Sequence, residues 1–361
     1  MTAGGSVVSS MSVFRQPSPE RRGRRHNSGS GRACIDRLIR RPGERRRQIH
    51  FALRAFLGVS ILSIAMSTAS PLCGQQLGHY IGSFTGLENG SAAPPGFYAA
   101  GFGLVEPVDS IKGPNGNTVL KPDINVAGVI AAYSLVTHKK ILGGEYGCAF
   151  MVPVLNTRFS SNVFDASAES AGVSDIFFEP IALGWKRGNT DYTINYGFYA
   201  PNGDFDPSQP LNPGLGFWEQ QIQVGLTQNL DARKLWNASL LTTWEVNASK
   251  LGLDMKPGPI FTGEYSFGRR FFKYQMNAGA VGYASQKLSA DSGSGINPLI
   301  KGDLDRAFGA GGEWKYTDIK HKLAFDARYE QQFGVELRTS GKLLVFSITY
   351  LDIFPPSAKQ K

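Results

Sequence analysis

The amino-acid sequence predicts an all-β fold, an antiparallel transmembrane β-barrel of about 12 strands. The first observation is period-two alternation. It is clearest at 323–330, where Leu323, Phe325 and Tyr329 share one face and three charged residues share the other. The second is that Gly, Pro, Asn and Asp separate such segments. The third is that no segment after the N-terminal leader has the ~18 consecutive apolar residues of a membrane-spanning helix. A soluble β-sandwich would show the same alternation and stays open as an alternative.

The first 75 residues differ from the rest of the chain in charge. They hold 13 Lys and Arg and 3 Asp and Glu, which leaves 25 basic and 26 acidic residues in the remainder. The folded part therefore has no basic excess that would indicate a nucleic-acid partner. Residues 1–44 are rich in Arg, Ser, Gly and Pro, which predicts a disordered basic extension. Residues 45–73 hold a run of three arginines, an apolar core and a small-residue exit, which predicts a secretory signal peptide. Export and the predicted barrel together predict the bacterial outer membrane.

The first four strands follow a lead-in at 74–95 that is rich in Gly, Ser and Pro. Residues 96–108 predict a strand rich in Gly and aromatic residues. Residues 123–136 and 141–155 predict the second and third strands, joined by a short charged turn. Residues 173–186 predict the fourth, with a proline that would place it at the edge of a soluble sheet. The facing of the second and fourth strands is ambiguous from the sequence.

The next three strands alternate clearly between apolar and polar residues. They are predicted at 191–200, 217–230 and 235–246, and the last two form a hairpin. On the apolar face of the last, Trp236 and Trp244 lie near its two ends. Tryptophans at this spacing are typical of the aromatic girdles of a membrane barrel.

Five further strands complete the predicted barrel. They lie at 259–269, 271–286, 304–316, 323–330 and 342–354. Many strands exceed the ~9–11 residues that a tilted strand needs to cross the hydrocarbon. An even number of strands agrees with single-chain bacterial barrels.

The predicted connections alternate loosely between short and long. The short ones are 137–140, 231–234 and 317–320, and the long ones are 156–171, 201–216 and 287–301. Short periplasmic turns and long outer loops would produce this asymmetry.

The polar faces of the strands carry the candidate functional residues, because they would line the lumen. Carboxylates predominate, so an open pore would mildly favour cations or neutral solutes over anions. The alternative is that these side chains plug the barrel with salt bridges and hydrogen bonds, because a lumen of about 12 strands can be a narrow pore or filled. The predicted lumen-lining residues are Glu145, Glu219, Gln221, Gln223, Glu245, Glu264, Glu313, Lys315, Asp326, Arg328 and Glu330.

The sequence offers no catalytic constellation, and an enzyme is not expected. After the leader the histidines are His79, which precedes the strands, and His138 and His321, which lie at or beside turns. No Ser–His pair stands out inside a strand. The three cysteines have no disulfide or zinc spacing, so neither a metal nor a cofactor is predicted.

Three short motifs resemble a known outer-membrane family. Residues 172–185 read GVSDIFFEPIALGW, residues 95–98 read PGFY, and residues 216–218 read GFW. In these motifs and in the order of its hairpins, the chain resembles the family named for the meta-pathway of phenol degradation, over roughly residues 95–354. The resemblance implies a β-barrel channel or transporter for small compounds, hydrophobic or aromatic ones among them. It implies outer-membrane lipid, a small-molecule solute and the barrel-assembly machinery as partners.

The chain departs from this family in its basic extension and in its tail. Barrels of this kind usually end on an aromatic residue that the assembly machinery reads, whereas here a tail at 355–361 follows Phe354. The alternative function is a structural or adhesive outer-membrane barrel with no open pore.

Overall fold

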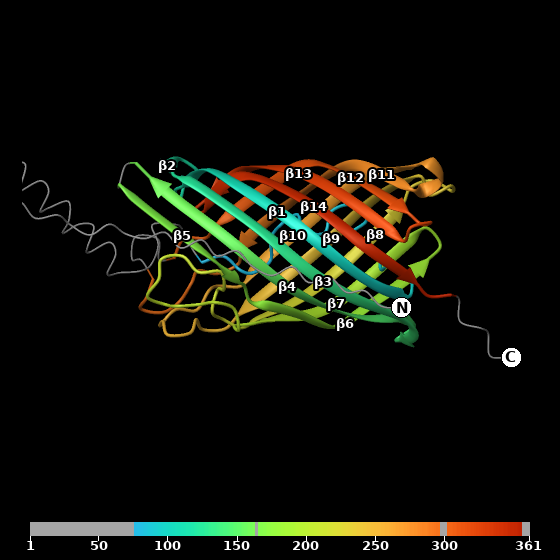
Figure 1. Ribbon diagram of the computed structural model, residues 1–361, viewed down its shortest axis with the longest axis horizontal. Coiled ribbons are helices and arrows are strands. Elements are labelled where there is room, and N and C mark those ends of the chain that lie inside the picture. The colour runs from blue at the N-terminus through green and yellow to red at the C-terminus, as the bar shows by residue number, and fades with distance from the viewer. Residues whose placement is uncertain (1–75, 163–164, 297–301, 356–361) are drawn as a thin grey trace, which may run out of the picture. The chain divides into compact units, whose positions relative to one another are not determined.

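The computed structural model describes residues 76–162, 165–296 and 302–355. Antiparallel strands, tilted to the long axis, wind around a common lumen (Figure 1). The strands are β1 Gly96–Lys112, β2 Thr118–Leu120, β3 Asp123–Ile141, β4 Gly144–Ser161, β5 Ala166–Val173, β6 Ile176–Arg187, β7 Thr190–Ala200, β8 Glu219–Asn229, β9 Trp236–Asn247, β10 Ile260–Phe271, β11 Met276–Lys287, β12 Arg306–Asp318, β13 Leu323–Glu336 and β14 Thr339–Ile353, with a short 3-10 turn η1 at Phe272–Tyr274.

The sheet closes on itself. Each wall strand pairs with the next, and β14 pairs with β1 from Gly96↔Ile353 to Ile111↔Thr339. The ring consists of β1, β3, β4 and β6 to β14, while β2 extends β1 and β5 pairs only with β4. Closure satisfies the backbone hydrogen bonds that an open edge would expose to lipid. The predicted twelve-stranded antiparallel barrel is confirmed, and the sandwich alternative is excluded.

Apolar side chains cover the outside of the barrel. Val129, Phe150, Ile222 and Ile348 are between 37% and 60% exposed, although they belong to regular strands. Exposed apolar surface of this extent is favourable only against lipid. Among the residues described, no helix is long and apolar enough to span a bilayer.

The two ends of the barrel differ in their connections. β1 begins and β14 ends at the same end, where tight turns such as Gly188-Asn189 join the strands. Longer connections, including 201–218 and 248–259, lie at the opposite end. Short turns and strand termini belong to the periplasmic side of such barrels. These ends are therefore called the periplasmic end and the extracellular end.

Two predicted connections were placed wrongly. Residues 137–140 are not a turn, because β3 continues to Ile141 and the reversal falls at Leu142 and Gly143, both with positive φ. Residues 156–171 are not a polar loop, because β4 and β5 pair there from Val154↔Val173 to Ser161↔Ala166. In both places the strands extend beyond the hydrocarbon of the membrane. Their side chains there are polar because they are in contact with water.

The fourth predicted strand is split in two. β4 pairs with β5 near its extracellular end and with β6 near its periplasmic end, and Ser174 and Asp175 lie between them. The Ser174 N–H still donates to the Pro153 carbonyl at 2.9 Å, so the ladder continues across the break. The break turns the Asp175 side chain into a fully buried position.

Candidate functional site

Residues 76–95 pass through the lumen and are called the plug segment. In Figure 1 the plug segment is the blue trace that lies between the front and back strands. At the extracellular end the Gln76 N–H donates to Asp291 at 3.0 Å. Near the periplasmic end Ser91 donates to Asp191 at 2.9 Å. Inside the barrel, Leu87 is 1% exposed. The plug segment thus occupies the lumen along most of its length.

Wall carboxylates satisfy the backbone of the plug segment. The plug segment has no regular secondary structure, so its N–H groups need other partners. Four carboxylates supply them, each on a different strand. The bonds are His79 N–H to Glu219 at 2.7 Å, Tyr80 N–H to Glu245 at 3.2 Å, Phe84 N–H to Glu264 at 3.1 Å and Leu87 N–H to Glu313 at 2.7 Å.

Two wall cations complete this polar side of the lumen. Arg328 pairs with Glu313 at 2.9 Å, and its guanidinium also donates to the Ser83 carbonyl. Lys315 pairs with Glu313 at 3.0 Å and donates to the Leu87 carbonyl at 2.8 Å. Charged hydrogen bonds in a water-poor lumen are stronger than neutral ones. The inner face of β8 to β13 is therefore called the polar wall.

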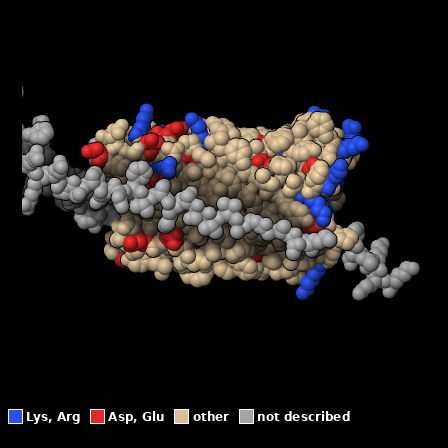
Figure 2. All heavy atoms as spheres, in the orientation of Figure 1, with Lys and Arg blue, Asp and Glu red and all other residues tan. Residues whose placement is uncertain are grey.

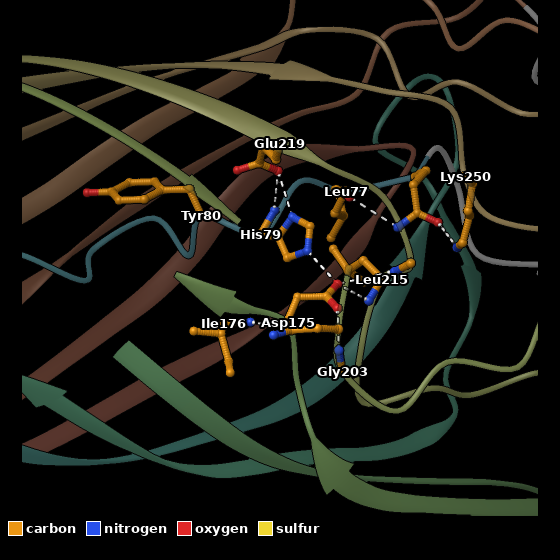
Figure 3. Close-up of polar contacts among 12 residues, drawn as sticks. Leu77, His79, Tyr80, Asp175, Ile176, Gly203, Leu215, Glu219 and Lys250 are labelled. Atoms are coloured by element: carbon orange, nitrogen blue, oxygen red, sulfur yellow. Dashed lines mark hydrogen bonds and ion pairs between the residues drawn. The ribbon is translucent and has the colours of Figure 1, made fainter. Parts of the chain in front are cut away.

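His79 anchors the plug segment through both of its ring nitrogens (Figure 3). Its Nδ1 lies 2.9 Å from Glu219 and its Nε2 lies 2.8 Å from Asp175. The imidazole stacks on Tyr199 with ring centroids 4.4 Å apart and meets the edge of Phe217 at 4.9 Å. Burial lowers the pKa of His79, but the two carboxylates outweigh it and raise the pKa from 6.5 to about 9. His79 is therefore a buried cation at neutral pH.

Asp175 connects His79 to the wall break and to the long connection 201–218. Its carboxylate accepts the N–H of Gly203 at 2.9 Å and that of Leu215 at 2.8 Å. The Gly216 N–H donates to it at 3.2 Å. Figure 3 shows Gly203 and Leu215 converging on this carboxylate opposite His79. One buried side chain thus ties the plug segment, the split strand and an extracellular connection together.

A second ionic cluster holds the extracellular end of the plug segment. The Lys287 ammonium is fully buried, 2.5 Å from Asp291 and 3.5 Å from Asp305, and it donates to the Gln76 carbonyl at 2.7 Å. Lys250 donates to the Gln76 side chain at 2.7 Å. Burial lowers the pKa of Lys250 to about 8 against the opposing carboxylates of Asp175 and Asp291.

The opposite side of the lumen is apolar. The inner faces of β14, β1, β3 and β4 form one continuous hydrophobic surface, called the apolar wall. Ile81 and Phe84 of the plug segment pack on it, and the rings of Phe84 and Phe102 are 5.0 Å apart. The apolar wall consists of Phe102, Leu104, Val126, Ile130, Met151, Leu155, Leu343 and Val345.

Most predicted lumen residues lie together on the polar wall. Eight of them are buried, namely Glu219, Gln221, Gln223, Glu245, Glu264, Glu313, Arg328 and Glu330. Lys315 and Asp326 are half-buried beside Arg328 and Glu313. Glu145 lies apart, next to the periplasmic turn, where it pairs across the strand with Lys140. Several of these side chains bind the plug segment in this state, and a role in conduction stays a prediction.

Two elements of the lumen were not predicted from the sequence. The lead-in was read only as a connector, although Leu77, Ile81, Phe84 and Leu87 make it more apolar than a solvated linker. The apolar wall was not predicted because no face was assigned to the strand at 96–108 and the facing of the strand at 123–136 was ambiguous. In β1 and β3 both faces are apolar, which in a barrel is the signal of a hydrophobic lumen surface.

One solved structure shares the fold of this chain at low sequence identity, and a second aligns more weakly. The COG4313 outer membrane channel from Pseudomonas putida F1 aligns with a TM-score of 0.63 and 12% identity, over 73% of this chain and 98% of that one. The β domain of the Bordetella autotransporter BrkA aligns with a TM-score of 0.44 and 12% identity, over 72% of this chain and 100% of that one. No curated protein sequence matches the chain significantly.

The sequence profile of one protein family matches residues 108–348. This stretch runs from the end of β1 to the middle of β14 and so covers nearly the whole barrel. The closed barrel with its lipid-facing surface is a protein of the bacterial outer membrane. Because the matched stretch is well over half of the chain, the protein belongs to the family described as "Putative MetA-pathway of phenol degradation".

Proposed function

We propose that the protein is an outer-membrane channel for small hydrophobic compounds, aromatic ones among them, and that the plug segment closes it. The observation that carries this proposal is the division of the lumen into an apolar wall and a polar wall. A pore for ions and sugars needs water along its whole lining. Here eight apolar side chains on four adjacent strands offer an apolar solute a continuous surface.

The division also separates the solute path from the attachment of the plug. The plug segment is hydrogen-bonded to carboxylates of the polar wall, while only Ile81 and Phe84 cover the buried core of the apolar wall. An apolar solute can replace such side chains without leaving a polar group unpaired. Displacing the plug segment from the polar wall would instead leave buried charges without partners. A hydrophobic compound therefore competes with the plug segment for the apolar wall, where displacement costs less free energy than at the polar wall.

The family and the fold agree with this proposal. The family description names phenol degradation, whose compounds are small and aromatic. A structure with the same fold is an outer-membrane channel in Pseudomonas putida. The alternative function is a structural barrel with no open pore, and the filled lumen is the observation that favours it.

Uptake of a hydrophobic aromatic dye separates the two functions. N-phenylnaphthylamine fluoresces after it crosses the outer membrane, so its rate of fluorescence increase reports permeation. Cells that produce the protein are expected to take up the dye faster than cells with an empty vector. Equal rates, with a folded barrel demonstrated by its heat-dependent mobility in SDS gels, would favour the structural barrel.

Two isosteric variants test the path itself. Val345→Thr places a hydroxyl on the apolar wall, where Val345 is 2% exposed. Val129→Thr makes the same change on the lipid-facing side, where Val129 is 60% exposed. A hydroxyl along the path costs an apolar solute about 1 kcal/mol, so Val345→Thr should slow dye uptake about five-fold. Val129→Thr should not change the rate. Equal rates in both variants would exclude the apolar wall as the path.

A further inference from the structure

The two ends of the barrel carry opposite charge patterns. Figure 2 shows Lys and Arg gathered along the right-hand rim, which is the periplasmic end, and Asp and Glu mostly towards the left. Within the described residues, the exposed basic side chains of the periplasmic end are Lys139, Lys140, Lys186, Arg187, Arg233, Lys234, Arg269, Lys273, Lys320 and Lys322. The acids nearest to them are half-buried: Glu145, Asp191, Asp231, Asp318 and Asp352. This rim presents an excess of positive charge at the depth of the periplasmic leaflet.

A groove on the outer wall opens at this rim. It has a volume of about 350 Å³ and lies on β6, β7 and β8. Its outward side chains alternate with inward ones along these strands, and Tyr192, Ile194 and Val224 are 40% to 46% exposed. Trp185 pairs with Tyr192, and Ile194 pairs with Val224, across adjacent strands. The groove therefore faces the membrane and not the lumen.

The groove changes character along its length. Arg187 is the last residue of β6 and lies at the rim, while Ile194 lies opposite Leu183, four residues deeper. Four residues of an extended strand span about 13 Å, or about 9 Å of membrane depth at a tilt of ~45°. One leaflet contributes about 15 Å of hydrocarbon. The groove thus runs from a cationic edge, past Trp185 and Tyr192, into the apolar part of one leaflet.

The cationic edge is prepared for an anion. The Arg187 backbone pairs with Thr190 in the β6–β7 ladder, but its guanidinium makes no hydrogen bond or ion pair with any residue that the structure describes. The Lys234 ammonium donates to the Gly188 carbonyl at 2.7 Å, which places a second cation beside the turn that follows Arg187. Lys186 is exposed next to Arg187 in β6, but it pairs with Asp191 and so lies on the lumen side of the strand. Arg187 lines the groove at the headgroup depth, and Lys234 lies beside the adjoining turn.

We propose that this groove binds an anionic glycerophospholipid of the periplasmic leaflet, with its phosphate at Arg187 and one acyl chain along Trp185, Tyr192, Ile194 and Val224. Charge complementarity selects an anionic headgroup over a zwitterionic one, because the edge holds more cations than acids. The apolar floor selects a lipid over a free phosphate ion. The proposal does not depend on whether the lumen conducts.

Bromine-labelled lipids test the proposal because bromine quenches tryptophan only at close range, and Trp185 lies in the groove. The full-length protein is placed in two membranes of identical lipid composition, a mixture of phosphatidylglycerol and phosphatidylcholine. In one membrane the acyl chains of phosphatidylglycerol carry the bromine, and in the other the same number of phosphatidylcholine molecules carry it. A Trp185→Phe variant identifies the share of quenching that belongs to Trp185 among the five tryptophans of the chain.

Brominated phosphatidylglycerol is expected to quench the Trp185 signal about five-fold more per molecule than brominated phosphatidylcholine. This is the preference that about 1 kcal/mol per basic side chain supplies. Arg187→Gln should bring the ratio close to one. Arg158→Gln, which removes an exposed arginine at the extracellular end, should leave the ratio unchanged.

Equal quenching by the two labelled lipids in the wild-type protein would overturn the proposal. So would a preference that survives Arg187→Gln. If Trp185→Phe does not give a folded, heat-modifiable barrel, the total tryptophan quenching of wild type and Arg187→Gln gives the same comparison. In that measurement the excess quenching caused by phosphatidylglycerol must fall in Arg187→Gln and stay unchanged in Arg158→Gln.

Discussion

Removal of the His79 side chain should open the lumen. In His79→Leu the plug segment keeps an apolar side chain of similar size, but Glu219 and Asp175 lose the cation between them. Both carboxylates are fully buried in the plugged state. When the plug segment leaves, water can reach them. The substitution therefore destabilises the plugged state more than the open one.

The size of this effect follows from the geometry. Removing one partner of a buried ion pair costs about 3–5 kcal/mol, because the other charge is left without compensation. Asp175 keeps three backbone N–H donors and Glu219 keeps the His79 N–H and the Gln221 amide, so the lower end of the range applies. About 3 kcal/mol corresponds to a shift of roughly 150-fold in the ratio of plugged to open barrels.

Single-channel recording in planar bilayers measures this ratio. The open fraction of His79→Leu should exceed that of the wild type by one to two orders of magnitude. Hydrogen exchange should also accelerate at the Tyr80 and Leu87 amides, which donate to wall carboxylates. The control is His321→Leu, which removes an exposed histidine bonded to Asp318 at a periplasmic turn. Conductance and exchange unchanged from wild type in a folded His79→Leu barrel would refute the role assigned to His79.

Three further predictions follow from the lumen. Conductance should rise as the pH passes about 9, and a flat pH profile would contradict this. Protonated His79 between Glu219 and Asp175 stabilises the plugged state. Because the pKa of His79 is raised, this stabilisation is complete below about pH 6.5 and is lost when His79 is deprotonated. Replacing Glu219, Glu245 and Glu313 with Gln should reduce cation selectivity, because the lumen loses negative charge; unchanged reversal potentials would contradict this. The same replacements should raise conductance, because these carboxylates also hold the plug segment. Leu104→Ala should destabilise the folded barrel by about 2–5 kcal/mol, measured as the urea dependence of the heat-modifiable band.

The wall of the barrel could be predicted from the sequence because its signal is local. A strand such as β9 alternates Trp236, Ala238 and Leu240 with Asn237 and Ser239, and this period alone assigns lipid and lumen faces. The ends of strands were harder to predict. β3 and β4 continue into water, where polar residues on both faces look like a loop although the backbone remains paired.

The contents of the lumen could not be predicted in the same way. The lead-in has no periodicity, so nothing local indicates that the His79 imidazole meets Glu219, 140 positions away, or Asp175 at the wall break. These contacts depend on closure of the whole ring. The apolar wall leaves a weaker local trace, because β1 and β3 lack a polar face. That trace becomes informative only after the barrel is assumed.

A crystal structure of the protein with 4-bromophenol would test the central claim most directly. The anomalous signal of bromine identifies the position of the ring independently of the shape of the electron density. The proposed function predicts bromine inside the barrel, against Phe102, Leu104 and Ile130, with Phe84 displaced from Phe102. Bromine sites confined to the lipid-facing surface or to the polar wall, with the contacts of Phe84 intact, would contradict a hydrophobic path through the lumen.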